Sequence, residues 1–218
     1  RFADVLGKQH ERLAMLVTRE TGKPLWEARQ EVVASLRAVD LLLEEGFAMF
    51  EPRVLHESDA RSDARPRGVV GILAPYPFPL LGPTVQVCAA LLAGNAIVLK
   101  PSKFTPAVGQ ALGEIADRCR LPRGAFNLLQ GTGATVGRTL AAHPDLDALL
   151  CAGAWDTAKA IRAATVERPE LPALLHAGGK AAAIVMGGDL DRAVYEVLVG
   201  AFLTAGQRPT STARVIVV

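Results

Sequence analysis

Gly68-Val-Val-Gly-Ile-Leu-Ala74 is a short run of apolar residues that does not alternate with polar ones. A second such run, Ala96-Ile-Val-Leu-Lys100, follows after a segment of helical composition, Leu80–Leu92. Strands that are buried on both faces have this continuous apolar character, and a helix between two of them is typical of a βαβ unit with parallel strands. This region therefore predicts an α/β fold built on a parallel sheet.

The alternation continues to the end of the chain. Further strands are predicted at Phe126–Leu129, Ala148–Cys151, Ala173–His176, Ala182–Met186 and Val215–Val218. Further helices are predicted at Thr105–Cys119, Ala134–Ala142, Trp155–Val166 and Leu190–Thr204. We therefore expect residues 68–218 to form one Rossmann-like domain with a doubly wound, mostly parallel sheet.

The residues before Gly68 follow a different pattern. Apolar side chains recur at helical spacing over Phe2–Thr18, and a second helix is predicted from about Leu25 to Glu45. Glu51–Pro66 is polar and contains a short β-like run, Arg53-Val-Leu-His56, so it is either a solvated connection or an arm that contacts another subunit. Residues 1–67 are thus expected to be a helical pair and a polar excursion packed on the main domain.

Composition excludes several classes of protein. The formal net charge is +2, and the 24 basic residues are scattered, so no electrostatic footprint for nucleic acid is expected. No uninterrupted apolar run of about eighteen residues occurs, so no membrane span is expected. The three cysteines show no CxxC spacing and the four histidines are dispersed, which predicts no metal site. Reduced thiols and the absence of a signal peptide predict a cytoplasmic protein.

Three predicted strand ends carry residues that could bind a nucleotide. Gly131-Thr-Gly-Ala-Thr-Val-Gly137 is either a phosphate-binding loop or a tight turn. Cys151–Ala158, with Gly153-Ala154 at its turn, is either a pyrophosphate site at a helix N-terminus or only a turn. In Lys100-Pro-Ser-Lys103 the side chains of Lys100, Ser102 and Lys103 are candidates for ribose or phosphate binding, and a solvated strand end is the alternative.

An ordered set of motifs resembles the aldehyde dehydrogenase superfamily over essentially all of the chain. Within it the sequence is most similar to the succinylglutamate-semialdehyde dehydrogenases of arginine catabolism. The motifs are Thr21-Gly-Lys-Pro-Leu-Trp-Glu-Ala28, Pro75-Tyr-Pro-Phe-Pro79, Leu91-Leu-Ala-Gly-Asn95, Lys100-Pro-Ser102, Leu121-Pro-Arg-Gly124, His143-Pro144, Gly178-Gly179 and Ala205-Gly-Gln-Arg208.

The resemblance implies a chemistry that three positions do not support. Family members form a cysteine thiohemiacetal, pass hydride to NAD(P), and hydrolyse the thioester with water activated by a glutamate. The family's cysteine position is Pro209, its glutamate position is His176, and its oxyanion-binding asparagine position is Pro77. We therefore expect aldehyde oxidation to be lost. Two alternatives stay open: a nucleotide-binding sensor, and an altered enzyme that uses His176 with Ser211 or Thr210.

The resemblance also implies changes in cofactor and partner binding. The family binds the adenosine ribose with a lysine and a glutamate, which here are Lys100 and Lys103, and a lysine at the second position could favour a 2′-phosphate. At the pyrophosphate turn, Ala154 lacks the family's serine hydroxyl, so weak or absent binding of NAD or NADP is expected. The family's second, catalytic domain is absent from these 218 residues, so a homo-oligomer or a partner chain is expected to cover an apolar face.

Overall fold

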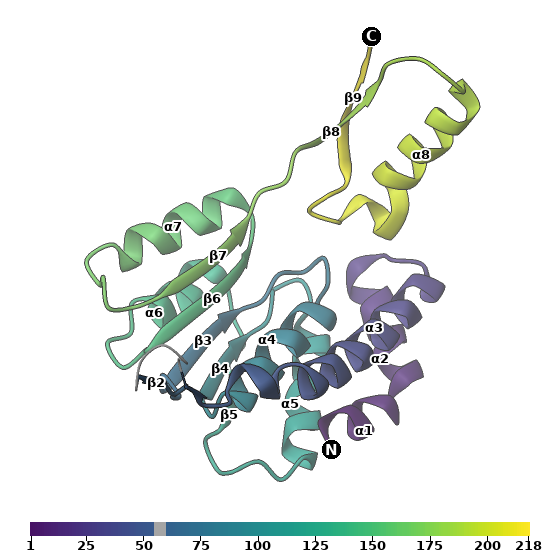
Figure 1. The fold of residues 1–218 in the computed structure, drawn as a ribbon. Helices are drawn as coiled ribbons and strands as arrows, with labels where there is room; N and C mark the ends of the chain where they lie inside the picture. The colour runs from purple at the N-terminus through teal and green to yellow at the C-terminus, as the bar shows by residue number, and fades with distance from the viewer. Residues whose placement is uncertain (55–59) are drawn as a thin grey trace.

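The computed structural model describes residues 1–54 and 60–218, and its centre is a five-stranded parallel sheet (Figure 1). The strand order is β5-β4-β3-β6-β7, with β3 at Val69–Leu73, β4 at Ala96–Lys100, β5 at Phe126–Leu128, β6 at Ala148–Gly153 and β7 at Ala173–Ala177. The chain enters at the central strand, runs outward to β5, and returns to β6 on the other side. This is a doubly wound sheet, so the Rossmann-like prediction is confirmed.

Helices cover both faces of the sheet. One apolar core, which includes Ile72 and Leu99, is covered by α1 (Phe2–Gly7), α2 (His10–Thr21), α3 (Leu25–Glu44), α4 (Leu81–Leu92) and α5 (Pro106–Arg118). The other core, which includes Leu73 and Leu149, is covered by α6 (Arg138–Ala141) and α7 (Trp155–Thr165). Neighbouring residues of β3 point to opposite faces, as the pleat of a strand requires. A short 3-10 turn, Phe47–Met49, follows α3.

Two helices differ from the sequence-based prediction. The first one, expected over Phe2–Thr18, is divided between α1 and α2 at Lys8 and Gln9, and each of the two segments buries apolar side chains. The helix expected over Ala134–Ala142 begins as a π-helical turn, Gly133–Gly137, and only then continues as α6. Two glycines in one turn have low α-helical propensity, which accounts for the irregular start.

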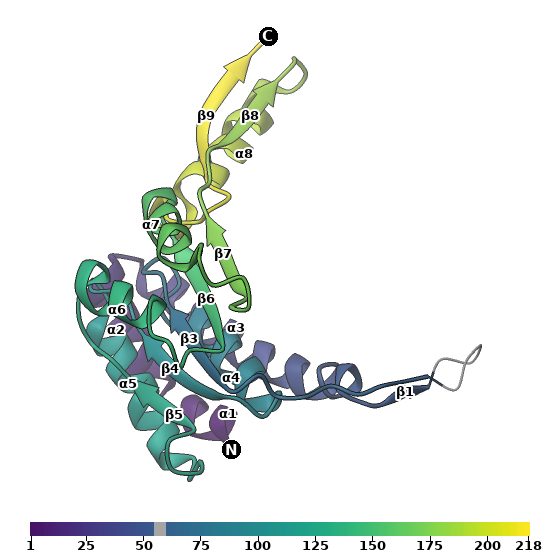
Figure 2. The same cartoon turned by 90° about the vertical axis from the view of Figure 1, so that its left-hand side faces the viewer.

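The last two strands do not join the central sheet. Strand β8 (Ala181–Val185) pairs in parallel with β9 (Thr212–Val217), and α8 (Leu190–Phe202) connects them. In Figures 1 and 2 this second βαβ unit stands apart from the five-stranded sheet. Gly178 and Gly179 both have positive φ, so the chain can turn away after β7 at a place where other residues would be strained.

The polar segment that precedes the main domain contains two short strands that pair with each other. Strands β1 (Arg53–Val54) and β2 (Arg61–Ser62) are antiparallel and project away from the body in Figure 2. Leu55 and His56 of the predicted β-like run lie outside the described residues. A role for this hairpin as a contact between subunits stays a prediction. Among residues 1–54 and 60–218, no helix has the length and apolar character that a membrane crossing requires.

A buried ion pair joins the N-terminal helices to the sheet domain. Lys23 Nζ donates to Glu31 Oε2 at 2.6 Å, and both side chains are 1% exposed. The other oxygen of Glu31 accepts hydrogen bonds from the backbone N–H groups of Leu80 at 2.9 Å and Leu81 at 3.1 Å. These amides begin α4, where the helix has no intrahelical acceptors for them. One carboxylate therefore satisfies three donors from two parts of the chain.

We predict that the two partners of this pair differ in their effect on stability. Glu31→Leu leaves a buried ammonium, a buried amide and a part-buried amide without an acceptor, so it should lower the free energy of unfolding by about 3–5 kcal/mol. Lys23→Met removes one donor from a carboxylate that keeps two others, so its effect should be smaller. Urea denaturation measures both, with Arg29→Met, which breaks an exposed pair with Glu11, as the control. Equal stability of the Glu31→Leu and wild-type proteins would contradict this role.

Candidate functional site

The corner between α8 and β9 has a strained backbone that is held by side chains. Thr204 and Ala205 have φ values of 61° and 52°, and Gly206 follows with 66°, within the 3-10 turn Leu203–Gly206. A left-handed conformation costs about 1–2 kcal/mol for a residue with a Cβ atom. Since two such residues are adjacent, the surrounding structure must stabilise them.

Three hydrogen bonds provide that support. The backbone N–H of Thr204 donates to Glu27 Oε1 on α3 at 2.7 Å. Gln207 Nε2 donates to the carbonyl oxygen of Thr21 at 2.7 Å, and Arg208 Nε donates to Thr204 Oγ1 at 2.8 Å. The corner is thus anchored on the junction of α2 and α3.

A pocket of about 610 Å³ lies between α3, the turn that begins α4, and this corner. Much of its wall is apolar, and a smaller set of polar groups lies among the apolar ones, as is usual in small-molecule sites. The lining residues are Lys23, Trp26, Glu27, Gln30, Glu31, Ala34, Phe78, Leu81, Leu203, Thr204, Arg208, Pro209 and Thr210.

Glu27 is the pocket residue that sequence reasoning missed. It is 8% exposed, and its Oε2 atom is buried without a hydrogen-bond partner. A signal was present, because Glu27, Glu31 and Ser35 recur every four residues on the buried face of α3. Polar residues at core spacing on a helix indicate buried partners that the sequence alone does not identify.

The three positions that the resemblance links to catalysis come from different elements. Pro209 is exposed at the corner, Pro77 is half-buried in the turn before α4, and His176 is exposed near the end of β7. The link after β7 runs against the corner, because a Cβ atom added to Gly179 would collide with the Pro209 carbonyl oxygen. The roles implied for Pro209, Pro77 and His176 stay predictions.

The alternative nucleophiles Ser211 and Thr210 are not hydrogen-bonded to His176. Ser211 Oγ is buried and has no hydrogen-bond partner, and Thr210 is exposed. A hydroxyl needs a base within hydrogen-bonding reach before it becomes a nucleophile. Within the described part of the chain, no hydroxyl–imidazole pair of this kind is formed at the corner.

None of the three cysteines is among the residues that line the pocket at the corner, and burial favours their thiol form. Burial raises the pKa of Cys88 on α4 to about 12 and that of Cys151 on β6 to about 11. Burial also raises the pKa of Cys119, which follows α5. Because the thiolate is the reactive form, these side chains are poor nucleophiles at neutral pH.

Lys100, the first predicted cofactor residue, is the last residue of β4. It is 5% exposed, and its Nζ atom donates to the carbonyl oxygens of Pro101 at 2.6 Å and Gly131 at 3.3 Å. Burial lowers the pKa of this ammonium group. An ammonium has three N–H donors, so one remains for a ligand. Lys100 therefore connects β4 to the glycine-rich turn.

Ser102 and Lys103 lie beyond the end of β4. The backbone N–H of Phe104 donates to Ser102 Oγ at 3.2 Å, and Lys103 Nζ is exposed above the Phe104 ring, 4.9 Å from its centroid. The serine side chain thus stabilises the turn. The Lys103 ammonium is free to meet an anion in solvent.

The turn predicted to bind a pyrophosphate has free space around it, but its side chains do not favour a phosphate. A Cβ atom on Gly153 would meet nothing within 4 Å, and Ala154 caps α7 without a side-chain hydrogen bond. Asp156 stands in the first turn of α7 and pairs with Lys159 at 2.8 Å. A carboxylate there already benefits from the helix dipole and repels a phosphate. Only backbone amides of this turn could hold a pyrophosphate.

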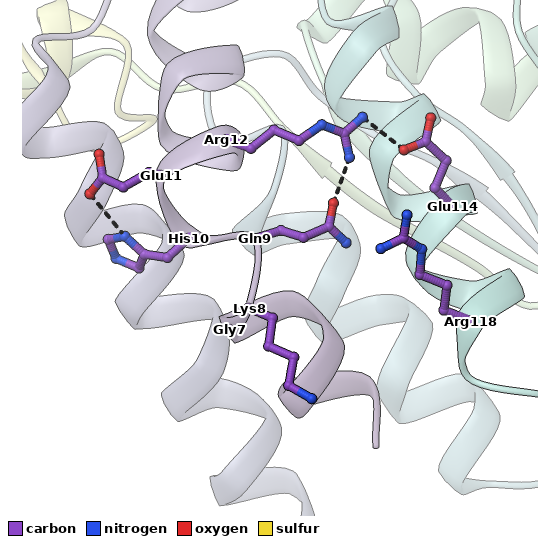
Figure 3. Close-up of a pocket in the computed structure, with 8 residues that line it drawn as sticks. All are labelled: Gly7, Lys8, Gln9, His10, Glu11, Arg12, Glu114 and Arg118. Carbon is purple, nitrogen blue, oxygen red and sulfur yellow. Dashed lines mark hydrogen bonds and ion pairs between the residues drawn. The ribbon is translucent and has the colours of Figure 1, made fainter.

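A second hollow lies between the junction of α1 and α2 and the last turns of α5 (Figure 3). Arg12 donates to Glu114 at 2.7 Å and to Gln9 Oε1 at 2.5 Å, and His10 lies 3.4 Å from Glu11. Several of the charged side chains that line this hollow therefore pair with one another. In the described parts of the chain, no group of three or more His, Cys, Asp and Glu side chains is arranged to hold a metal ion.

We predict that Ala205→Gly stabilises the protein. Glycine adopts positive φ without the Cβ penalty, so the free energy of unfolding should rise by about 1 kcal/mol, less the entropy that glycine gains in the unfolded chain. Thermal unfolding followed by circular dichroism measures the change. Ala183→Gly in strand β8 should destabilise the protein and serves as the matched control, and a lower melting temperature for Ala205→Gly would contradict the strained corner.

Comparisons with known proteins agree with this arrangement. The family model described as "Aldehyde dehydrogenase family" matches residues 1–218. An N-succinylglutamate 5-semialdehyde dehydrogenase of Burkholderia mallei is 39% identical over 224 residues, covering 100% of this chain and 45% of its own length. The chain therefore spans less than half the length of this curated relative.

Two solved structures have the same fold over nearly the whole chain. Lactaldehyde dehydrogenase from Escherichia coli is 32% identical with a TM-score of 0.90, covering 99% of this chain and 46% of that one. A 3,6-anhydro-L-galactose dehydrogenase in complex with NAP is 30% identical with a TM-score of 0.91, covering 100% and 46%. The sheet, the corner and these matches together show that the chain belongs to the aldehyde dehydrogenase family.

Proposed function

We propose that this chain is the dinucleotide-binding part of an aldehyde dehydrogenase-family protein that has lost thiol-based oxidation of aldehydes. The proposal rests on Pro209, which lies at the corner between α8 and β9 and has no nucleophilic side chain. The buried cysteines cannot substitute for it, since their pKa values lie well above neutral pH.

The missing nucleophile matters because of how hydride leaves an aldehyde. Addition of a nucleophile converts the carbonyl carbon to a tetrahedral alkoxide, and the re-forming C=O bond then expels hydride. The developing alkoxide also needs hydrogen-bond donors. Pro77 has no side-chain donor and no backbone N–H, so it supplies neither form of support.

Binding of NAD or NADP is a separate part of the proposal. The carboxyl edge of the sheet retains Lys100 with one free donor, the exposed Lys103, and the open turn at Gly153. A relative of the same fold was solved with NAP. A nicotinamide dinucleotide would serve there as the hydride acceptor in the family reaction. Asp156 opposes the pyrophosphate, so we propose weak binding, and a nucleotide sensor is the second candidate function.

Association is proposed from the apolar face of α8. No residue of α8 is buried, and the exposed side chains along it include Leu190, Val194, Leu198 and Phe202. An apolar stripe of this length on a soluble surface is typical of an interface. A second copy of the chain or a partner chain is proposed to cover it.

A hydride-transfer assay tests the proposed loss of catalysis. The purified chain is mixed with NAD or NADP and N-succinylglutamate 5-semialdehyde, and formation of the reduced cofactor is followed by its absorbance. We expect no reduced cofactor above the protein-free rate, since no group adds to the aldehyde. The curated Burkholderia mallei relative serves as the positive control. Cofactor reduction proportional to the concentration of this chain would overturn the proposal.

A further inference from the structure

We propose that the hollow between the α1–α2 junction and the last turns of α5 binds the phosphate group of a small anion. The hollow has a volume of about 600 Å³, and three side chains that are cations at neutral pH line it, namely Lys8, Arg12 and Arg118. None of its lining residues belongs to the corner, to the predicted nucleotide-binding edge or to α8, so the site is separate from the proposed function.

The first carboxylate of the hollow, Glu11, is neutralised by an arginine that does not line it. Arg29 on α3 donates to Glu11 through Nε at 3.0 Å and through Nη2 at 3.0 Å. This hydrogen bonding lowers the pKa of Glu11, so the carboxylate is ionised at neutral pH. The negative charge of Glu11 is therefore already matched by Arg29, and it does not compensate Lys8 or Arg118.

The second carboxylate, Glu114, is paired with Arg12. Arg12 Nη2 donates to Glu114 Oε2 at 2.7 Å. Arg118 stands four residues after Glu114 on α5, a spacing at which a glutamate and an arginine can pair on one helix face. That pair is not formed between these two described residues, and in Figure 3 the Arg118 guanidinium points toward Gln9. One carboxylate thus neutralises one of two guanidinium groups.

Lys8 and Arg118 are the cations of the hollow that have no carboxylate partner in the part of the chain that the structure describes. Lys8 directly follows α1, and Arg118 lies in the last turn of α5, so the two walls of the hollow contribute one cation each. The guanidinium group can donate two parallel hydrogen bonds to an oxyanion, and the flexible stem of the lysine lets its ammonium group follow the anion.

The number of unpaired cations favours a phosphate group over a carboxylate. A phosphate ester carries a charge of about −1.5 to −2 at neutral pH and has three strong acceptor oxygens. One such group can therefore neutralise both Lys8 and Arg118. A carboxylate carries a single negative charge, so it would leave one of the two cations without a partner.

Isothermal titration calorimetry at low ionic strength tests this site with defined anions. Inorganic phosphate and pyrophosphate supply the free group, glycerol 3-phosphate supplies the ester, and acetate supplies a single charge. We expect at least one phosphate compound to bind about tenfold or more tightly than acetate, because acetate forms fewer charge-assisted hydrogen bonds. The tightest of the three identifies the source of the group. Added salt should weaken binding, since the Arg12 and Glu114 side chains are 48% and 36% exposed.

Three variants place the anion in the hollow. Arg118→Gln and Lys8→Gln each remove one unpaired cation, so each should weaken phosphate binding by about fivefold or more. Glu114→Gln removes the carboxylate that pairs with Arg12 and frees a third cation. It should therefore tighten binding by about threefold or more. The three side chains are exposed or half-buried, so the variants should fold like the wild-type protein.

Two further variants serve as matched controls. Arg162→Gln removes an exposed arginine of α7 that does not line the hollow, so it should leave the affinity unchanged. Lys103→Gln removes the exposed lysine beyond the end of β4, where a nucleotide phosphate could compete for the probe. Phosphate binding in the hollow should not depend on it.

Four results would overturn the phosphate site. They are the absence of heat with all three phosphate compounds, unchanged affinity in both Arg118→Gln and Lys8→Gln, weaker binding by Glu114→Gln, and loss of binding in Lys103→Gln. The last of these would place the anion at the carboxyl edge of the sheet. None of the four bears on the hydride-transfer assay, so this proposal and the proposed loss of catalysis fail separately.

Discussion

The arrangement depends on two buried carboxylates of α3, one turn apart. Glu31 joins Lys23 to the first amides of α4, so it fixes the helical layer against the sheet domain. Glu27 accepts the amide of Thr204, a residue 177 positions later in the chain, and so fixes the corner against the same helix. Because a buried carboxylate without donors is costly, both groups favour the one packing that satisfies them.

The contacts that hold the corner do not depend on the side chain at position 209. The left-handed residues Thr204 and Ala205 are held by Glu27, Gln207 and Arg208, and none of these contacts involves position 209. Pro209 takes part in none of these three supporting hydrogen bonds. The proposed loss of aldehyde oxidation would therefore leave the support of the corner intact.

Much of the fold could be predicted from the sequence, because continuous apolar strands and intervening helices indicate a parallel sheet. The bounds of β4, Ala96–Lys100, agree with the predicted strand. The sequence did not predict that β8 and β9 pair with each other and not with the central sheet, since their pairing partners depend on the turn at Gly178 and Gly179. The candidate site was predicted only at its corner: the unpaired oxygen of Glu27 results from contacts distant in sequence.

Alkylation mapped by mass spectrometry tests the central claim most directly. Wild-type protein and Pro209→Cys are treated briefly with iodoacetamide at neutral pH, and the modified peptides are identified. The account predicts no rapid adduct on the wild-type protein, because its three cysteines are held as thiols by burial, and one adduct at position 209 in the variant. Rapid modification of any native cysteine would contradict the account, since the chain would then possess a reactive thiol.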